Sequence, residues 1–99
     1  MDPSFEKASP STQMEWICGT YGNIKSWGYN NEVPAYEEMV AFFIQKYSIE
    51  KIKHEASEQL NEMQYSRLTG LSGNLGQRHQ VQMDFLKMVI ESGEFPKVR

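Results

Sequence analysis

Four side chains that could bind a metal ion or move a proton recur at intervals of four residues: Glu50, His54, Glu58 and Glu62. On a helix this spacing places them on one face, where carboxylates and an imidazole can ligate a divalent metal. Residues 54–58, His-Glu-Ala-Ser-Glu, resemble a zinc-protease motif, but Glu58 occupies the position of that motif's second histidine. On the helical wheel the row lies opposite the apolar residues Ile52, Ala56 and Leu60, so it faces water. We therefore expect a solvated charged strip and no metal site.

A glycine-rich stretch, Gly70–Gly76, precedes Arg78 and could turn its backbone amides toward an anion. Arg78 could then hold a phosphate or carboxylate through two hydrogen bonds. The spacing matches neither the P-loop nor the dinucleotide-binding fingerprint. The stretch is more typical of a turn between two helices, in which Asn74 caps the second helix.

The segment 75–92 predicts a helix that is too apolar to lie on a surface, because apolar side chains cover more than half of its circumference. Such a helix must be covered on two sides, by its own chain or by a partner. Its polar residues Arg78, His79 and Gln82 lie on the apolar side, so they need internal partners or form the polar edge of an interface. We favour the interface. The predicted partner-binding residues are Arg78, His79, Gln82, Phe85, Leu86 and Val89, with Phe42 as an outlying contact.

A second candidate site is an aromatic and amide-rich loop formed by Trp27, Tyr29, Asn30 and Asn31. Loops of this composition can recognise a partner through stacking and hydrogen bonding. Cys18 lies on an apolar stripe with Ile17 and Tyr21, which is typical of a buried thiol rather than a nucleophile. Because no catalytic triad or pair of acids is indicated either, we expect neither enzymatic activity nor a cofactor.

The elements that must position these residues are mainly helical. Apolar periodicity, capping residues and proline positions predict helices near 11–25, 34–47, 49–69 and 75–92, packed as a small bundle. The glycines at 19 and 22 leave a β-hairpin open for the first third of the chain. Residues 1–10 are expected to form a flexible arm unless Phe5 docks, residues 11–93 one domain, and residues 94–99 a tail.

The chain's size and charge narrow the choice of function. Its 99 residues suit one domain. Its formal charge of −3 differs from the strongly positive charge that is typical of nucleic-acid-binding proteins. The single cysteine, Cys18, cannot form an intrachain disulfide, and the first residues do not resemble a signal peptide. We expect a cytoplasmic protein without a membrane span.

The sequence thus predicts a non-enzymatic interaction or regulatory protein of the adaptor or inhibitor type. We expect it to act through the apolar face of its last helix, as a homodimer or against another protein. The alternative is a small nucleic-acid-binding regulator that uses the Gly70–Arg78 turn and nearby basic residues: Arg67, Lys97 and Arg99.

Overall fold

The computed structural model describes residues 2–68 and 76–98, without the side chains of residues 66–68. Within these ranges the regular structure is entirely helical: α1 (Pro3–Lys7), α2 (Pro10–Trp27), the short 3-10 helix η1 (Asn30–Glu32), α3 (Val33–Lys46), α4 (Ile49–Leu68) and α5 (Gly76–Ser92). This confirms the predicted small helical bundle. The first third is a helix and not a hairpin.

Local capping explains where the helices start and stop. The Ser9 hydroxyl accepts a hydrogen bond from the Thr12 amide at 3.2 Å, and the Ser48 hydroxyl accepts one from the Lys51 amide at 3.2 Å. These bonds satisfy amides that a helix leaves unpaired in its first turn. Gly28 ends α2 with a φ of 69°, a left-handed conformation that glycine adopts without strain.

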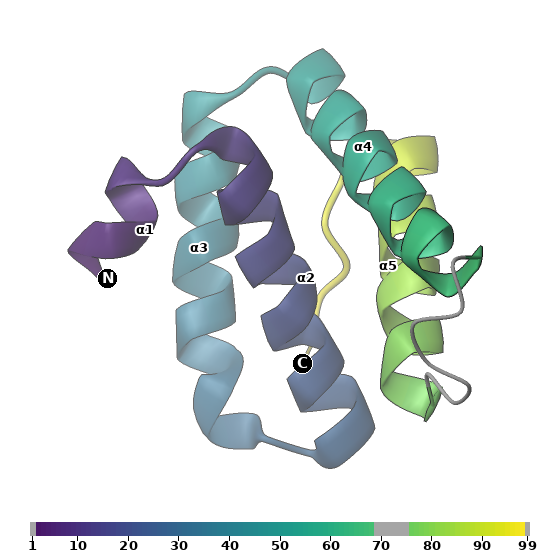
Figure 1. Ribbon diagram of the computed structural model, residues 1–99. Helices are drawn as coiled ribbons and strands as arrows, with labels where there is room; N and C mark the ends of the chain where they lie inside the picture. The colour runs from purple at the N-terminus through teal and green to yellow at the C-terminus, as the bar shows by residue number, and fades with distance from the viewer. Residues whose placement is uncertain (1, 69–75, 99) are drawn as a thin grey trace.

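Helix α2 lies at the centre of the fold, with α3 on one side and the α4–α5 pair on the other (Figure 1). The core fills the space between them with fully buried side chains, including Met14, Ile17, Phe43, Phe85 and Leu86. The apolar side of α5 is therefore covered by its own chain. Helices α3 and α4 are separate, because α3 ends at Lys46 and α4 begins at Ile49.

The N-terminal end of the described chain packs on the bundle. Phe5 is 1% exposed, and its carbonyl accepts a hydrogen bond of 2.7 Å from the buried side chain of Gln13. Its ring contacts Trp16 and Phe42, with centroid distances of 5.8 and 5.6 Å. We expected residues 1–10 to form a flexible arm unless Phe5 docks on the domain, and in the structure Phe5 is docked between Trp16 and Phe42.

Candidate partner-binding surface

Two glycines of α2, Gly19 and Gly22, allow α5 to cross this helix closely where the side chains of Arg78 and Gln82 lie. A Cβ atom on Gly22 would lie 2.9 Å from Cγ of Gln82 and 3.3 Å from Cγ of Arg78. Gly19 has more room, since its nearest neighbour would be Nη2 of Arg78 at 3.5 Å. Glycine lowers the intrinsic stability of a helix, but here it makes space for the two long side chains of α5.

Arg78 is held by three contacts with α2. Its Nε donates to Oδ1 of Asn23 at 2.8 Å, and its Nη2 donates to the Gly19 carbonyl at 3.1 Å. Its guanidinium also lies over the ring of Trp27, 5.2 Å from the ring centroid. Asn23 in turn donates to the Glu32 carboxylate at 3.2 Å, so a polar chain runs from α5 through α2 to η1. Arg78 thus has internal partners, which is the arrangement we favoured less.

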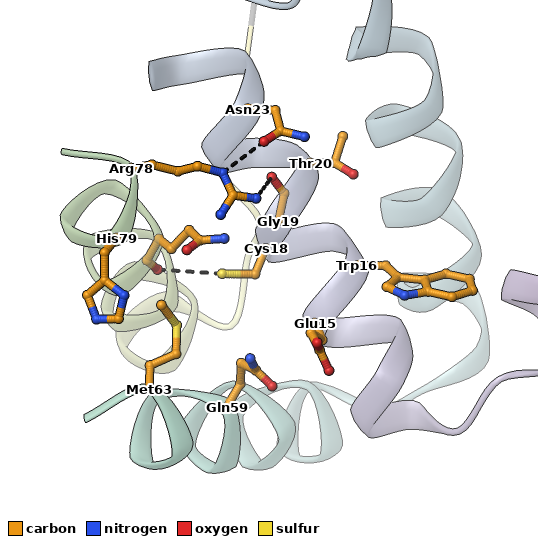
Figure 2. Close-up of a pocket in the computed structure, with 11 residues that line it drawn as sticks. Glu15, Trp16, Cys18, Gly19, Thr20, Asn23, Gln59, Met63, Arg78 and His79 are labelled. Carbon is orange, nitrogen blue, oxygen red and sulfur yellow. Dashed lines mark hydrogen bonds between the residues drawn. The ribbon is translucent and has the colours of Figure 1, made fainter. Parts of the chain in front are cut away.

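A groove of about 550 Å³ opens beside Arg78, between α2, α4 and α5 (Figure 2). The side chains of Arg78 and His79 border it from α5, and those of Gln59 and Met63 point into it from α4. Oε1 of Gln59 is buried and has no hydrogen-bond partner in the described part of the chain. A buried acceptor of this kind favours a donor that enters the groove, because desolvation without a hydrogen bond is costly.

Next to Arg78, the predicted recognition loop forms an exposed aromatic edge. Trp27 is 56% exposed and Tyr29 46% exposed, and their ring centroids lie 5.5 Å apart. Asn30 and Asn31 follow in η1 and are exposed as well. The structure therefore joins two sites that the sequence suggested separately, because Arg78 lies over Trp27.

The apolar half of the predicted interface lies elsewhere. Phe85, Leu86 and Val89 are 0% exposed, and the Phe85 ring packs 4.6 Å from that of Tyr21. The prediction that they meet a partner needs correction in this structure, since α2 and α4 pack along α5 and the rings of Tyr36 and Phe95 contact that of Phe85. The helical wheel showed that this side needed a cover, but not which chain supplied it.

Gln82 and Phe42 are also accounted for within the chain. Gln82 is 8% exposed, and its carbonyl accepts a long contact of 3.7 Å from Sγ of Cys18. Phe42 is half-buried away from the groove, under Lys46 at 5.4 Å and against Phe5. Of the residues predicted to bind a partner, Arg78 and His79 are the ones that border the groove and remain half-exposed.

The thiol that borders the groove is held in its protonated form. Burial raises the pKa of the Cys18 thiol to about 12, with a smaller lowering by Arg78, so the thiol stays protonated at neutral pH. His54 and Glu58 lie 3.7 Å apart on the exposed face of α4, as the charged strip predicts. No cluster of His, Cys, Asp and Glu that could hold a metal occurs within residues 2–68 and 76–98.

Sequence reasoning missed Asn23 and left the docking of Phe5 open. Asn23 is separated from Arg78 by 55 positions, and periodicity within one helix cannot reveal such a contact. A signal for Phe5 was present in Asp2 and Pro3, which form an N-cap and first turn around it. The Gly70–Leu75 part of the predicted anion-binding turn, together with the Arg67 side chain and Arg99, lies outside the described residues.

The fold and the site define an all-α bundle with an arginine-supported aromatic edge beside an open groove. Comparisons with protein-family models, curated proteins and solved structures found no match for this chain. Within the described ranges, no helix combines the length and the apolar character needed to cross a membrane.

Proposed function

We propose that the protein is a non-enzymatic interaction module that binds another protein through the edge formed by Trp27, Tyr29 and Arg78. The observation that supports this most is that both Tyr29 and the Arg78 guanidinium contact the exposed ring of Trp27. Trp, Tyr and Arg are the residue types that contribute most to binding energy at protein interfaces. An adaptor or an inhibitor would use such a surface.

The geometry also limits the entropy lost on binding. Two hydrogen bonds and the Trp27 ring fix the guanidinium of Arg78 before any partner arrives. Side chains that are already ordered lose less conformational freedom in a complex. The adjoining groove offers a place for a polar group of the partner, because Oε1 of Gln59 has no hydrogen-bond partner among the described residues.

Site-specific photo-cross-linking in the source cells tests the proposal. A photoreactive phenylalanine replaces Tyr29 in one variant and, as a control, Ile44 in another. Ile44 is 51% exposed and lies near the opposite end of α3 from η1. We expect a protein adduct at position 29 that is absent at position 44 and is lost when Trp27→Ala or Arg78→Ala is added. The same adducts at both positions would refute the proposed surface.

The homodimer predicted from the sequence remains a prediction. Light scattering over a range of concentrations measures the mass directly, and a dimer that persists in Trp27→Ala would place its interface elsewhere. The nucleic-acid alternative is also still a prediction, since exposed rings beside an arginine can stack on bases. It requires salt-sensitive binding of duplex or single-stranded probes that weakens in Arg78→Ala.

A further inference from the structure

The arginine that borders the groove keeps hydrogen-bonding capacity for a ligand. A guanidinium has N–H donors on all three of its nitrogens. The bonds to Asn23 and to the Gly19 carbonyl use Nε and Nη2 of Arg78, so Nη1 has no hydrogen-bond partner among the described residues. Figure 2 shows Nη1 pointing away from both bonded groups and into the groove. Arg78 can therefore bind an anion there while it keeps its contacts with α2.

Two glutamine amides also line the groove. Gln82 is 8% exposed, and its backbone carbonyl receives the contact from Cys18, whereas its side-chain amide forms no hydrogen bond with residues 2–68 or 76–98. On the α4 wall, Oε1 of Gln59 is likewise without a partner in these ranges. Buried amides cost free energy until a ligand or an ordered water bonds to them. The packing of the described chain thus leaves three polar side chains around one groove with unused hydrogen-bonding groups.

The charges along the groove indicate which ligand fits. Arg78 supplies a positive charge from α5, and the exposed Glu15 borders the same groove from α2. A ligand with one negative charge can pair with Arg78, whereas a phosphate monoester or a nucleic-acid backbone brings more negative charge and is repelled more strongly by Glu15. The glutamine amides match the N–H and C=O groups of a peptide backbone. Together these groups favour a peptide segment with one acidic side chain.

We propose that the groove between α2, α4 and α5 binds a segment of the partner protein that inserts one aspartate or glutamate side chain. Its carboxylate pairs with Nη1 of Arg78, and its backbone bonds to the amides of Gln59 and Gln82. A groove of about 550 Å³ suits a short segment of this kind. The inference rests on the proposed function, because one partner covers both the groove and the aromatic edge that Arg78 shares with Trp27.

Titration of the full chain with short peptides, followed by NMR, tests the site without the partner. The probe is acetyl-Gly-Asp-Gly-amide, in which the side chain carries the only carboxylate, and the control peptide has asparagine in its place. We expect the side-chain N–H signals of Arg78, Gln59 and Gln82 to shift saturably with the aspartate peptide. The asparagine peptide should bind at least about tenfold more weakly, because a hydrogen bond to a charged group is stronger than one between neutral groups.

Gln59→Leu separates binding from folding. It removes an unpaired buried acceptor, so the variant should be at least as stable in urea as the unaltered chain, yet it should bind the aspartate peptide at least about threefold more weakly. Gln64→Leu is the matched control. Gln64 lies on the same helix, is exposed and does not border the groove, so this change should leave peptide binding unaltered.

Several outcomes would overturn the proposal. Equal binding of the aspartate and asparagine peptides, or shifts that never saturate, would show that the groove does not recognise a carboxylate. Tighter binding of inorganic phosphate than of the aspartate peptide would assign the site to phosphate. If the same signals shift when the unaltered chain is concentrated without peptide, the occupant is a second copy of this chain.

Failure of this proposal can be told apart from failure of the proposed function. A cross-linked adduct at position 29 that persists in Gln59→Leu, together with no peptide binding, would refute the groove and leave the aromatic edge. Carboxylate-dependent peptide binding without any adduct at position 29 would refute the edge and leave the groove as a binding site.

Discussion

The middle of α5 and its first two turns contact α2 in different ways. In the middle, Phe85 is 0% exposed and packs its ring on that of Tyr21. In the first two turns, Arg78 and Gln82 cross two glycines, and Arg78 forms hydrogen bonds at the edge of an open groove. The same two helices thus pack through apolar side chains in the middle of α5 and through hydrogen-bonded polar side chains, close to solvent, in its first two turns.

This difference separates stability from recognition. Burial of large apolar side chains supplies most of the free energy that holds two helices together. Hydrogen bonds near the surface add little net stability, because water satisfies the same groups in the unfolded chain. Changes in the middle of α5 should therefore affect folding, and changes near Arg78 should mainly affect binding.

The largest effect is expected from Phe85→Ala. Removing a fully buried ring should lower the free energy of unfolding by about 3–5 kcal/mol, through lost burial and the cavity left behind. Urea denaturation followed by circular dichroism measures this. Met88→Ala is the control, because Met88 lies on the same helix but is 42% exposed, and its loss should be below about 1 kcal/mol. Equal losses for the two variants would contradict the comparison.

Alanine should destabilise the fold at Gly22 but not at Gly19. Gly22→Ala places a Cβ atom 2.9 Å from Cγ of Gln82, so we expect a loss of about 1–3 kcal/mol despite the better helix propensity of alanine. Gly19→Ala meets its nearest neighbour at 3.5 Å and should be neutral or stabilising by up to ~1 kcal/mol. Thermal or urea unfolding of both variants tests the pair. The same sign at both positions would mean that the close crossing is not maintained in solution.

The helices could be predicted because their signals are local. Ser9 with Pro10, Ser48 and the apolar stripes fix the helix type and, within a few residues, the ends. The exposed Trp27–Asn31 loop followed from the same kind of pattern, as did the solvent-facing His54 row. Each of these features depends on residues that are neighbours along the chain.

The rest of the candidate site depends on contacts between distant residues. The helical wheel placed Arg78 and Phe85 on the side of α5 that needs a cover, but α2 as the cover follows only from the tertiary fold. The same is true of the Tyr36–Pro96 hydrogen bond, which spans 60 positions. Glycines at 19 and 22, which argued against a helix by propensity, are explained by the α5 side chains that cross them.

A smaller loss of stability is expected at alkaline pH from Cys18, a buried thiol that lies between the apolar and the polar contacts of α2 with α5. Burial raises its pKa from the ordinary 9.0 to about 12, so between these values the unfolded chain loses the thiol proton and the folded chain keeps it. Stability from this group is therefore fully present below pH 9 and falls as the pH rises toward 12. At pH 10 the loss should be about 1 kcal/mol.

Cys18→Ala is the matched variant for this pH dependence. Burial also raises the pKa of Tyr21 and Tyr36, so both chains should lose stability in alkali, and the alanine variant should lose less. Urea midpoints at pH 7 and pH 10 give the difference. An identical loss in the two chains would mean that the thiol is not desolvated in the folded state.

The smallest effect is the coupling energy between Arg78 and Trp27, and it tests the polar contact in the first two turns of α5 most directly. A double-mutant cycle with Arg78→Ala, Trp27→Ala and the combined variant should give a coupling energy of about 0.5–1 kcal/mol, since Trp27 is exposed and the guanidinium remains partly hydrated. Arg78→Lys keeps the charge but cannot reproduce the planar geometry that reaches Asn23, Gly19 and the ring together, so it should recover only part of the loss. A coupling near zero, with full recovery by lysine, would mean that Arg78 acts as a simple surface charge. The aromatic edge would then lack the preorganisation on which the proposed recognition surface depends.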